Sequence, residues 1–193
     1  MTAFNLITQI IGIAAMLFNV LSFQQKEQRR LIFMQLFGSL LFAVQFLMLS
    51  IAAGEFMMGC ALNICGIVRG YVYSHKEQCR AEHPAWLIGF IAAYLTSYVL
   101  TFTVFGTTPT AANFIIEFLP VIAMTATTIS FSMKEARHVR LLGFINSPAW
   151  LCYNLLRASI GGALGEIFGL GSVIIGIIRM DIKKEKNHHQ TNA

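Results

Sequence analysis

Charged side chains are scarce in this chain of 193 residues: Asp, Glu, Lys and Arg make up 12% of it, whereas hydrophobic residues make up 56%. Soluble proteins carry about 25% charged residues, so this balance argues against an ordinary soluble domain with one small core. The few charges are unevenly spaced and leave long apolar stretches between them. A bilayer-spanning helix needs about 20 mostly apolar residues, and these stretches meet that need. We therefore predict an integral membrane protein.

The motifs of common enzymes are also absent from the sequence. There is no glycine-rich phosphate-binding loop with a lysine, no His-Glu-x-x-His motif and no serine nucleophile motif. We therefore expect no enzymatic activity and no cofactor. His75, Cys79 and His83 are spaced four residues apart, but no fourth ligand is evident, so we expect no bound metal. The four cysteines lie in apolar stretches or one short loop and indicate no disulfide framework.

Seven apolar stretches can be counted along the chain. The third is long enough only if Glu55 and Arg69 lie at opposite membrane interfaces. The first has no basic segment before it and no cleavage site after it, so we interpret it as a retained span. We thus expect an all-α membrane protein with seven spans, at residues 4–23, 31–54, 54–73, 86–110, 111–133, 141–156 and 161–178.

The lysines and arginines predict the orientation of these spans. If there are seven, 13 of the 14 basic residues fall on one side of the membrane, and the other side has only Arg157. Cytoplasmic loops are enriched in Lys and Arg, so the N-terminus should lie outside and the C-terminal tail in the cytoplasm. The net charge of +5 then reflects topology and contact with anionic lipids, and we expect no nucleic-acid partner.

An internal repeat supports the count of seven. Residues match at a separation of 108, such as Ser22-Phe23 with Ser130-Phe131, and Gly59 matches Gly169 at 110. Two parallel three-helix units need one extra crossing between them, which gives a 3+1+3 plan. We divide the chain into a first repeat (1–73), a cytoplasmic loop with the linker helix (74–110), a second repeat (111–180) and a cytoplasmic tail (181–193).

Three segments carry a resemblance to a known family: Ser22–Arg30 (SFQQKEQRR), Leu62-Asn63 to Arg69, and Ser159–Gly162 followed by Glu166. Over residues 1 to 180 the chain resembles the YgjV-type bacterial inner membrane proteins, which look related to the SWEET and PQ-loop group. The resemblance implies an inner membrane location and a transporter-like scaffold. The Pro-Gln dipeptide of that group is missing, and Pro120 and Pro148 have no matching prolines in the first repeat, so a symmetric proline hinge is not implied.

Polar residues within spans are the candidates for a binding site, because polar groups in hydrocarbon usually face the bundle interior. Asn63, near the middle of its span, is the first choice. Such amides could bind a small neutral solute such as a sugar, or they could join helices by hydrogen bonds. The candidate substrate-binding residues are Asn63, Asn146, Trp150, Asn154 and Ser172.

Three charged residues form a second group of candidates. Glu117 is the only acid well inside its span, and it could couple transport to protons or be an interfacial, ion-paired glutamate. Arg157 could pair with Glu166 or with Glu117. The sequence therefore favours a carrier or facilitator for a small solute, working by alternating access between two three-helix halves. The alternative is a membrane receptor or assembly protein that transports nothing, and a homo-oligomer stays open in either case.

Overall fold

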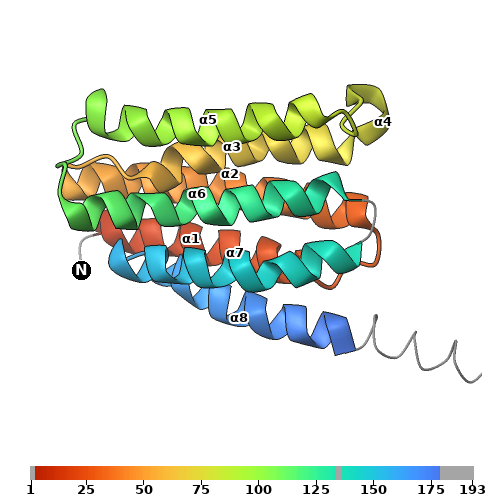
Figure 1. Ribbon diagram of the computed structural model, residues 1–193. Coiled ribbons are helices and arrows are strands. Elements are labelled where there is room, and N and C mark those ends of the chain that lie inside the picture. Colours follow the sequence, from red (N-terminus) through yellow and green to blue (C-terminus); the bar gives the residue numbers. More distant parts are fainter. Residues whose placement is uncertain (1–2, 134–135, 179–193) are drawn as a thin grey trace, which may run out of the picture.

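The computed structural model describes residues 3–133 and 136–178, and within these residues all regular secondary structure is helical. The predicted all-α fold class is therefore confirmed. The predicted tail, residues 181–193, lies outside the described residues. The helices are α1 (Ala3–Ser22), α2 (Gln28–Ala53), α3 (Met58–Ser74), α4 (Lys76–Cys79), α5 (Pro84–Thr103), α6 (Ala111–Ser132), α7 (Ala136–Leu156) and α8 (Ile160–Gly176), shown in Figure 1.

Local signals in the sequence explain several helix ends. Gly54 ends α2 in the left-handed conformation, with φ of 66°, and its backbone N–H donates to the Ser50 carbonyl. Glycine takes this conformation without a steric penalty. The Thr110 hydroxyl accepts the Asn113 N–H at the start of α6, and Pro84 occupies the first turn of α5. The predicted third span began at Gly54, but α3 begins at Met58 because the intervening residues form the connection.

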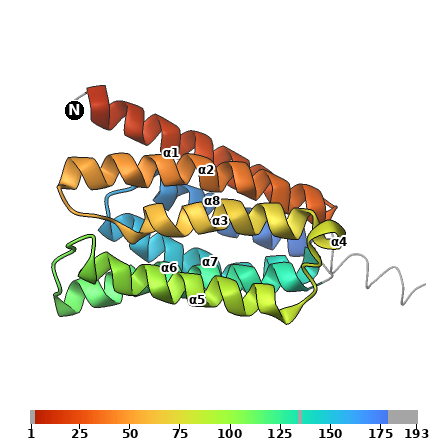
Figure 2. The same cartoon turned by 90° about the horizontal axis from the view of Figure 1, so that it is seen from above.

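Six of the helices form a closed ring. Going around it, each helix packs mainly against the next in the order α1, α2, α3, α6, α7, α8, and α8 packs against α1. We call these six helices the ring, α1–α3 the first half and α6–α8 the second half. Helix α5 lies outside the ring and packs on α3 and α6, while the short α4 follows α3 (Figure 2).

Four of the helices, α1, α2, α5 and α6, are long and apolar enough to cross a membrane. Helices α3 and α8 have 17 residues each, and α7 carries Arg137 and Arg140 in its first turns. Length and composition alone thus select four spans among the described helices.

Many large apolar side chains are exposed, and several polar side chains are buried. Gln45 and Glu117 are fully buried, whereas Ile88 and Ile115 are more than 60% exposed. Buried polar residues and exposed apolar ones are expected where lipid surrounds the protein and polar groups turn inward. The bundle therefore exposes an apolar surface and buries several polar side chains together with its apolar core.

The connections gather at two ends of the bundle (Figure 1). The α1–α2 connection and α4 lie at one end, which we call the Lys76 end, and the α2–α3, α5–α6 and α7–α8 connections lie at the other, the Arg157 end. Arg69 corrects one expectation. It was placed at a membrane interface, but it is only 4% exposed and lies inside the ring, where the backbone and side chains of α6 provide acceptors for its guanidinium.

Candidate functional site

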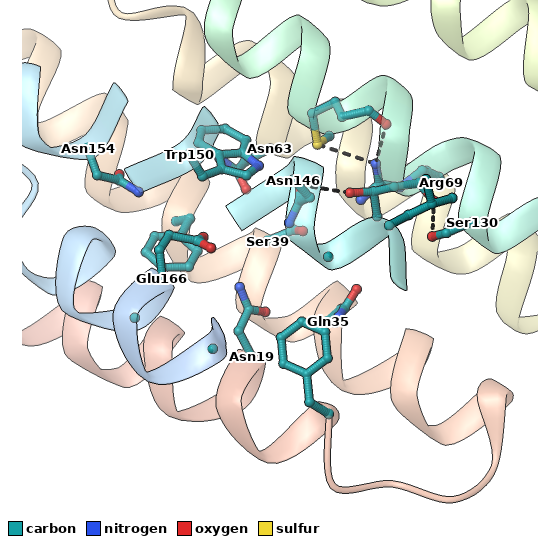
Figure 3. Close-up of a pocket in the computed structure, with 18 of the residues that line it drawn as sticks. Asn19, Gln35, Ser39, Asn63, Arg69, Ser130, Asn146, Trp150, Asn154 and Glu166 are labelled. Atoms are coloured by element: carbon teal, nitrogen blue, oxygen red, sulfur yellow. Dashed lines mark hydrogen bonds between the residues drawn. The ribbon is translucent and has the colours of Figure 1, made fainter. Parts of the chain in front are cut away.

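A cavity lies in the centre of the ring (Figure 3). All six ring helices contribute to its wall, and α5 contributes no residue to it. The lining residues are Asn19 and Phe23 from α1 and its end, Gln35, Ser39, Phe42 and Phe46 from α2, Asn63 and Arg69 from α3, Met124, Thr127 and Ser130 from α6, Leu142, Gly143, Asn146, Trp150 and Asn154 from α7, and Gly165, Glu166 and Gly169 from α8.

Most of the predicted binding residues lie in this wall. Asn63, Asn146, Trp150 and Asn154 all line the cavity. The three on α7 are four residues apart and therefore share one helical face, which is the face turned toward the cavity. Glu166, predicted as a proton-coupling or ion-pairing group, also lines the cavity, from α8.

The amides of the wall have different hydrogen-bonding states. The Asn63 side-chain N–H donates to the Gly59 carbonyl of its own helix at 2.8 Å, so this bond joins no second helix. The Asn146 amide oxygen accepts from the Thr127 hydroxyl at 2.9 Å, which links α7 to α6. Asn154 is 2% exposed, and its amide oxygen has no hydrogen-bond partner in the described part of the chain. This oxygen lies against Gly162 of α8, where an added Cβ would be 2.4 Å from it.

Ser172 is not brought into the cavity. Its hydroxyl accepts a hydrogen bond from the Gln24 side-chain amide and donates to the Val20 carbonyl at 3.3 Å. Ser172 lies about one helical turn beyond Gly169, the last cavity residue of α8. At that level the end of α1 covers α8, so the serine joins two helices and does not face the cavity.

Glu117 and Arg157 form a network at the Arg157 end. The Glu117 carboxylate, which is fully buried, forms an ion pair with the Arg157 guanidinium. It also accepts the Met58 backbone N–H at 2.9 Å and the Tyr153 hydroxyl at 3.1 Å. Of the two partners predicted for Arg157, the structure thus gives Glu117 and not Glu166. The carboxylate satisfies the N-terminus of α3, where the helix dipole favours a negative charge.

Further bonds extend this network across both halves. Arg157 donates to the Asn113 amide oxygen at 3.1 Å and lies 3.8 Å from the Glu55 carboxylate. The Tyr153 hydroxyl accepts the Gly59 N–H at 2.9 Å. Residues from the start of α3 are in this way joined to α6 and to the end of α7, so the first and second halves are held together at the Arg157 end.

An aromatic cluster separates this network from the cavity. The Tyr153 ring centroid lies 5.5 Å from that of Phe46 and 5.7 Å from that of Trp150. Phe46 and Trp150 stack at 6.2 Å and are themselves part of the cavity wall. Contacts of this geometry are favourable for aromatic rings. The cavity is therefore bounded by apolar rings on the side of the Arg157 end.

A related contact is found at the opposite junction of the two halves. Gln9 on α1 precedes Glu117 by 108 residues, the separation of the internal match. Its side-chain oxygen accepts the Gly161 N–H at 3.3 Å, near the start of α8, and its side-chain N–H donates to the Ala158 carbonyl at 3.2 Å. Gln9 thus contacts the N-terminus of α8 as Glu117 contacts that of α3.

Arg69 is the site residue that sequence reasoning missed most clearly. Its guanidinium donates to the Met124 carbonyl at 3.2 Å and to the Thr128 hydroxyl at 3.4 Å, and it lies 4.9 Å from the centre of the Phe131 ring. Gln35, Ser39, Thr127 and Ser130 were missed as well. The separation of 108 was an available signal, because it relates Phe42 to Trp150 and Phe46 to Asn154, and all four line the cavity.

Comparison with known proteins gives one match. Residues 6–184 match the Imp-YgjV family, described as bacterial inner membrane protein. No curated protein and no solved structure matches the chain.

Proposed function

The chain belongs to the Imp-YgjV family of bacterial inner membrane proteins, and from this premise we propose that it carries a small polar solute across that membrane. The inner membrane location follows from the family and from the apolar helices. In the proposed mechanism the two halves of the ring move against each other, so that the central cavity opens to one side of the membrane at a time. Such alternating access around a midplane site is typical of transporters built from repeats.

The observation that carries the proposal is how the two halves share the cavity. Four pairs of lining residues are separated by 108 positions, with one member of each pair in each half. Equivalent positions of two repeated units thus face the same space, as expected when a solute is held between them. The pairs are Asn19 with Thr127, Gln35 with Gly143, Phe42 with Trp150, and Phe46 with Asn154.

The order of the ring supports two parallel units. The contacts α1–α2 and α2–α3 in the first half correspond to α6–α7 and α7–α8 in the second, and the junction α3–α6 corresponds to α8–α1. A rotation that exchanges the halves therefore preserves the pattern of neighbours. We propose on this basis the 3+1+3 plan, with α5 as the linker that returns the chain across the membrane.

The seven-span count agrees with this plan. Helices α3 and α8, with 17 residues, are about 26 Å long at the helical rise, near the lower limit for a span. The basic residues Lys26, Arg29, Arg30, Lys76 and Arg80 lie in or beside the connections of the Lys76 end. We propose that this end faces the cytoplasm and that the Arg157 end and the N-terminus face outward.

The conformation described here fits a carrier closed on its outer side. The network of Glu117 and Arg157 joins the halves at the Arg157 end, and the rings of Phe46, Trp150 and Tyr153 lie between that network and the cavity. Opening to the outside would require these contacts to separate. Ion pairs and aromatic contacts that form in one state and break in the other are a means of setting the balance between two states.

Uptake into proteoliposomes tests the proposal directly. The purified protein is reconstituted and offered labelled sugars, polyols, amino acids, amines and carboxylates, with protein-free vesicles as the reference. Carriage of at least one compound faster than in protein-free vesicles is expected. Rates equal to those of protein-free vesicles for every compound would contradict the proposal and favour a receptor or assembly protein.

Asn63→Ala separates a solute-binding role from a packing role. Among the described residues the Asn63 amide bonds only to Gly59 of its own helix, so its loss should change the unfolding free energy by less than about 1 kcal/mol. Uptake should nevertheless fall at least about tenfold, equivalent to about 1.4 kcal/mol of lost binding. Thr103→Ala is the matched control, because Thr103 on α5 likewise bonds only to a carbonyl of its own helix, that of Val99, and lies outside the cavity.

A further inference from the structure

The cavity wall contains a buried positive charge without a counter-ion. Arg69 is only 4% exposed, and the groups around its guanidinium are the neutral carbonyl and sulfur of Met124, the Thr128 hydroxyl and the Phe131 ring. Its Nε atom has no hydrogen-bond partner among the residues that the structure describes. In the part of the chain that the structure describes, no carboxylate lies within ion-pairing distance of it. An unpaired buried cation is unfavourable, so an anionic group that enters the cavity would be stabilised there.

An acidic side chain faces the same cavity from the other side. Glu166 projects from α8, and no basic side chain that the structure describes forms a salt bridge with it. The unpartnered amide oxygen of Asn154 also belongs to the wall. Figure 3 shows Glu166 and Asn154 toward one side of the cavity and Arg69 with Ser130 toward the other, with Asn63 and Asn146 between them. One side thus offers hydrogen-bond acceptors and the other offers donors.

Arg69 and Glu166 do not pair with each other in the described part of the chain. No salt bridge joins Arg69 to Glu166 among the described residues, and their helices, α3 and α8, lie opposite each other in the ring, with two helices between them on either path. A direct contact would close the cavity. A bound molecule that reaches both side chains would instead complete an ion pair at each wall.

We infer that the ligand of this cavity is a small zwitterion whose cationic and anionic groups are separated by several bonds, as in an ω-amino acid or a dipeptide. The cationic group binds Glu166, and the anionic group binds Arg69. The part between the charges lies against Asn63, Asn146 and Trp150. This inference rests on the proposed function and names the class of solute for the same site.

Other classes of solute fit the two charges less well. A sugar leaves both Arg69 and Glu166 without a partner of opposite charge. A simple carboxylate satisfies Arg69 but leaves Glu166 without a cationic partner, and a simple amine satisfies Glu166 but leaves Arg69 without an anionic partner. An α-amino acid such as glycine carries both charged groups on one carbon atom, so it cannot contact side chains on opposite walls at once.

Fluorescence of Trp150 gives a binding assay that does not depend on transport. The chain has two tryptophans, and Trp86 lies outside the cavity, where its ring N–H donates to the Cys79 carbonyl. In a Trp86→Phe variant, Trp150 in the cavity wall is the only tryptophan left. Its emission is titrated with 4-aminobutyrate, with butylamine and butyrate, which each lack one charge, and with glycine and glucose.

We expect 4-aminobutyrate to bind saturably and at least tenfold more tightly than butylamine, butyrate, glycine or glucose. Glu166→Gln should remove the advantage over butyrate, and Arg69→Gln should remove the advantage over butylamine. Ser172→Ala, on α8 but outside the cavity, should leave the order unchanged. The order of binding affinities measured on the protein with native Arg69 and Glu166 tests the inference even if Arg69→Gln fails to fold.

Equal or tighter binding of glucose, glycine or a singly charged compound would overturn the inference, as would the absence of any saturable change with 4-aminobutyrate. The outcome is separable from that of the proposed function. Binding of 4-aminobutyrate without its uptake into proteoliposomes would contradict the carrier and leave the ligand class standing. Uptake of another compound without binding of 4-aminobutyrate would support the carrier and contradict the ligand class.

Discussion

The guanidinium of Arg157, at the end of α7, forms an ion pair with the fully buried carboxylate of Glu117 on α6, and the same carboxylate accepts the first N–H of α3 at Met58. One side chain thereby fixes three helices and both halves of the ring. The pair lies between the aromatic cluster and the Arg157 end. Its removal should therefore affect both the stability of the protein and the closure of that end.

Arg157→Ala should destabilise the protein strongly. The change leaves the Glu117 carboxylate buried without its cation, and loss of one partner of a buried pair typically costs about 3–5 kcal/mol. Thermal unfolding of the purified protein in detergent measures the effect. Arg30→Ala is the control, because the Arg30–Glu27 pair is exposed, with side-chain exposures of 72% and 65%, and should contribute less than about 1 kcal/mol. Equal effects of the two substitutions would contradict the role of the network.

Gly161→Ala should disturb the junction of α1 with α8. A methyl group added to Gly161 would lie 2.6 Å from the backbone carbonyl carbon of Gly12, so the two helices would have to move apart. We expect a lower unfolding temperature and slower uptake. In Gly171→Ala, on the same helix, the added methyl meets no atom within 4 Å, and the change should be neutral or stabilise the helix by about 0.5–1 kcal/mol. A Gly161→Ala protein as stable as Gly171→Ala would show that this close approach is unimportant.

Cysteine labelling tests the orientation. Thr108→Cys places an exposed thiol in the α5–α6 connection at the Arg157 end, whereas native Cys79 lies in α4 at the Lys76 end. Cys152, which is also exposed, is first replaced by Ser. In intact cells an impermeant maleimide should label the introduced thiol but not Cys79, and permeabilised cells should show labelling of both. Reaction of Cys79 in intact cells would reverse the proposed topology.

Much of the helical plan could be predicted from where charges are absent. The gaps between charged residues locate the long helices, since a lipid-facing helix largely excludes ionised side chains. The predicted stretch 86–110 nevertheless runs seven residues past the end of α5, and the stretch 141–156 starts five residues after the start of α7. The start of α3 was placed too early because Glu55 and the apolar Phe56 and Met57 resemble a first helical turn in sequence. Only the structure shows that Gly54 turns the chain and that this segment forms the connection.

Only part of the site could be predicted from the sequence. The physical reason why a residue could or could not be found differs from one residue to another. Asn146 and Asn154 could be found because an amide in an apolar helix needs a polar surrounding. Arg69 could not, since an arginine near the end of a span is equally compatible with a membrane interface, and its acceptors on α6 come from tertiary packing. By helical spacing Ser172 lies on the same side of α8 as the cavity residues. The end of α1 covers this part of α8, and the sequence alone could not show that.

The position of α5 makes the two junctions between the halves unequal. Helix α5 packs on α3 and α6 and so covers the junction between them, whereas among the described helices none covers the junction of α1 with α8 in the same way. A motion that widens the α3–α6 side must displace an additional helix, while one that widens the α1–α8 side displaces lipid alone. We therefore expect the α3–α6 junction, which α5 covers, to be stiffer than the α1–α8 junction.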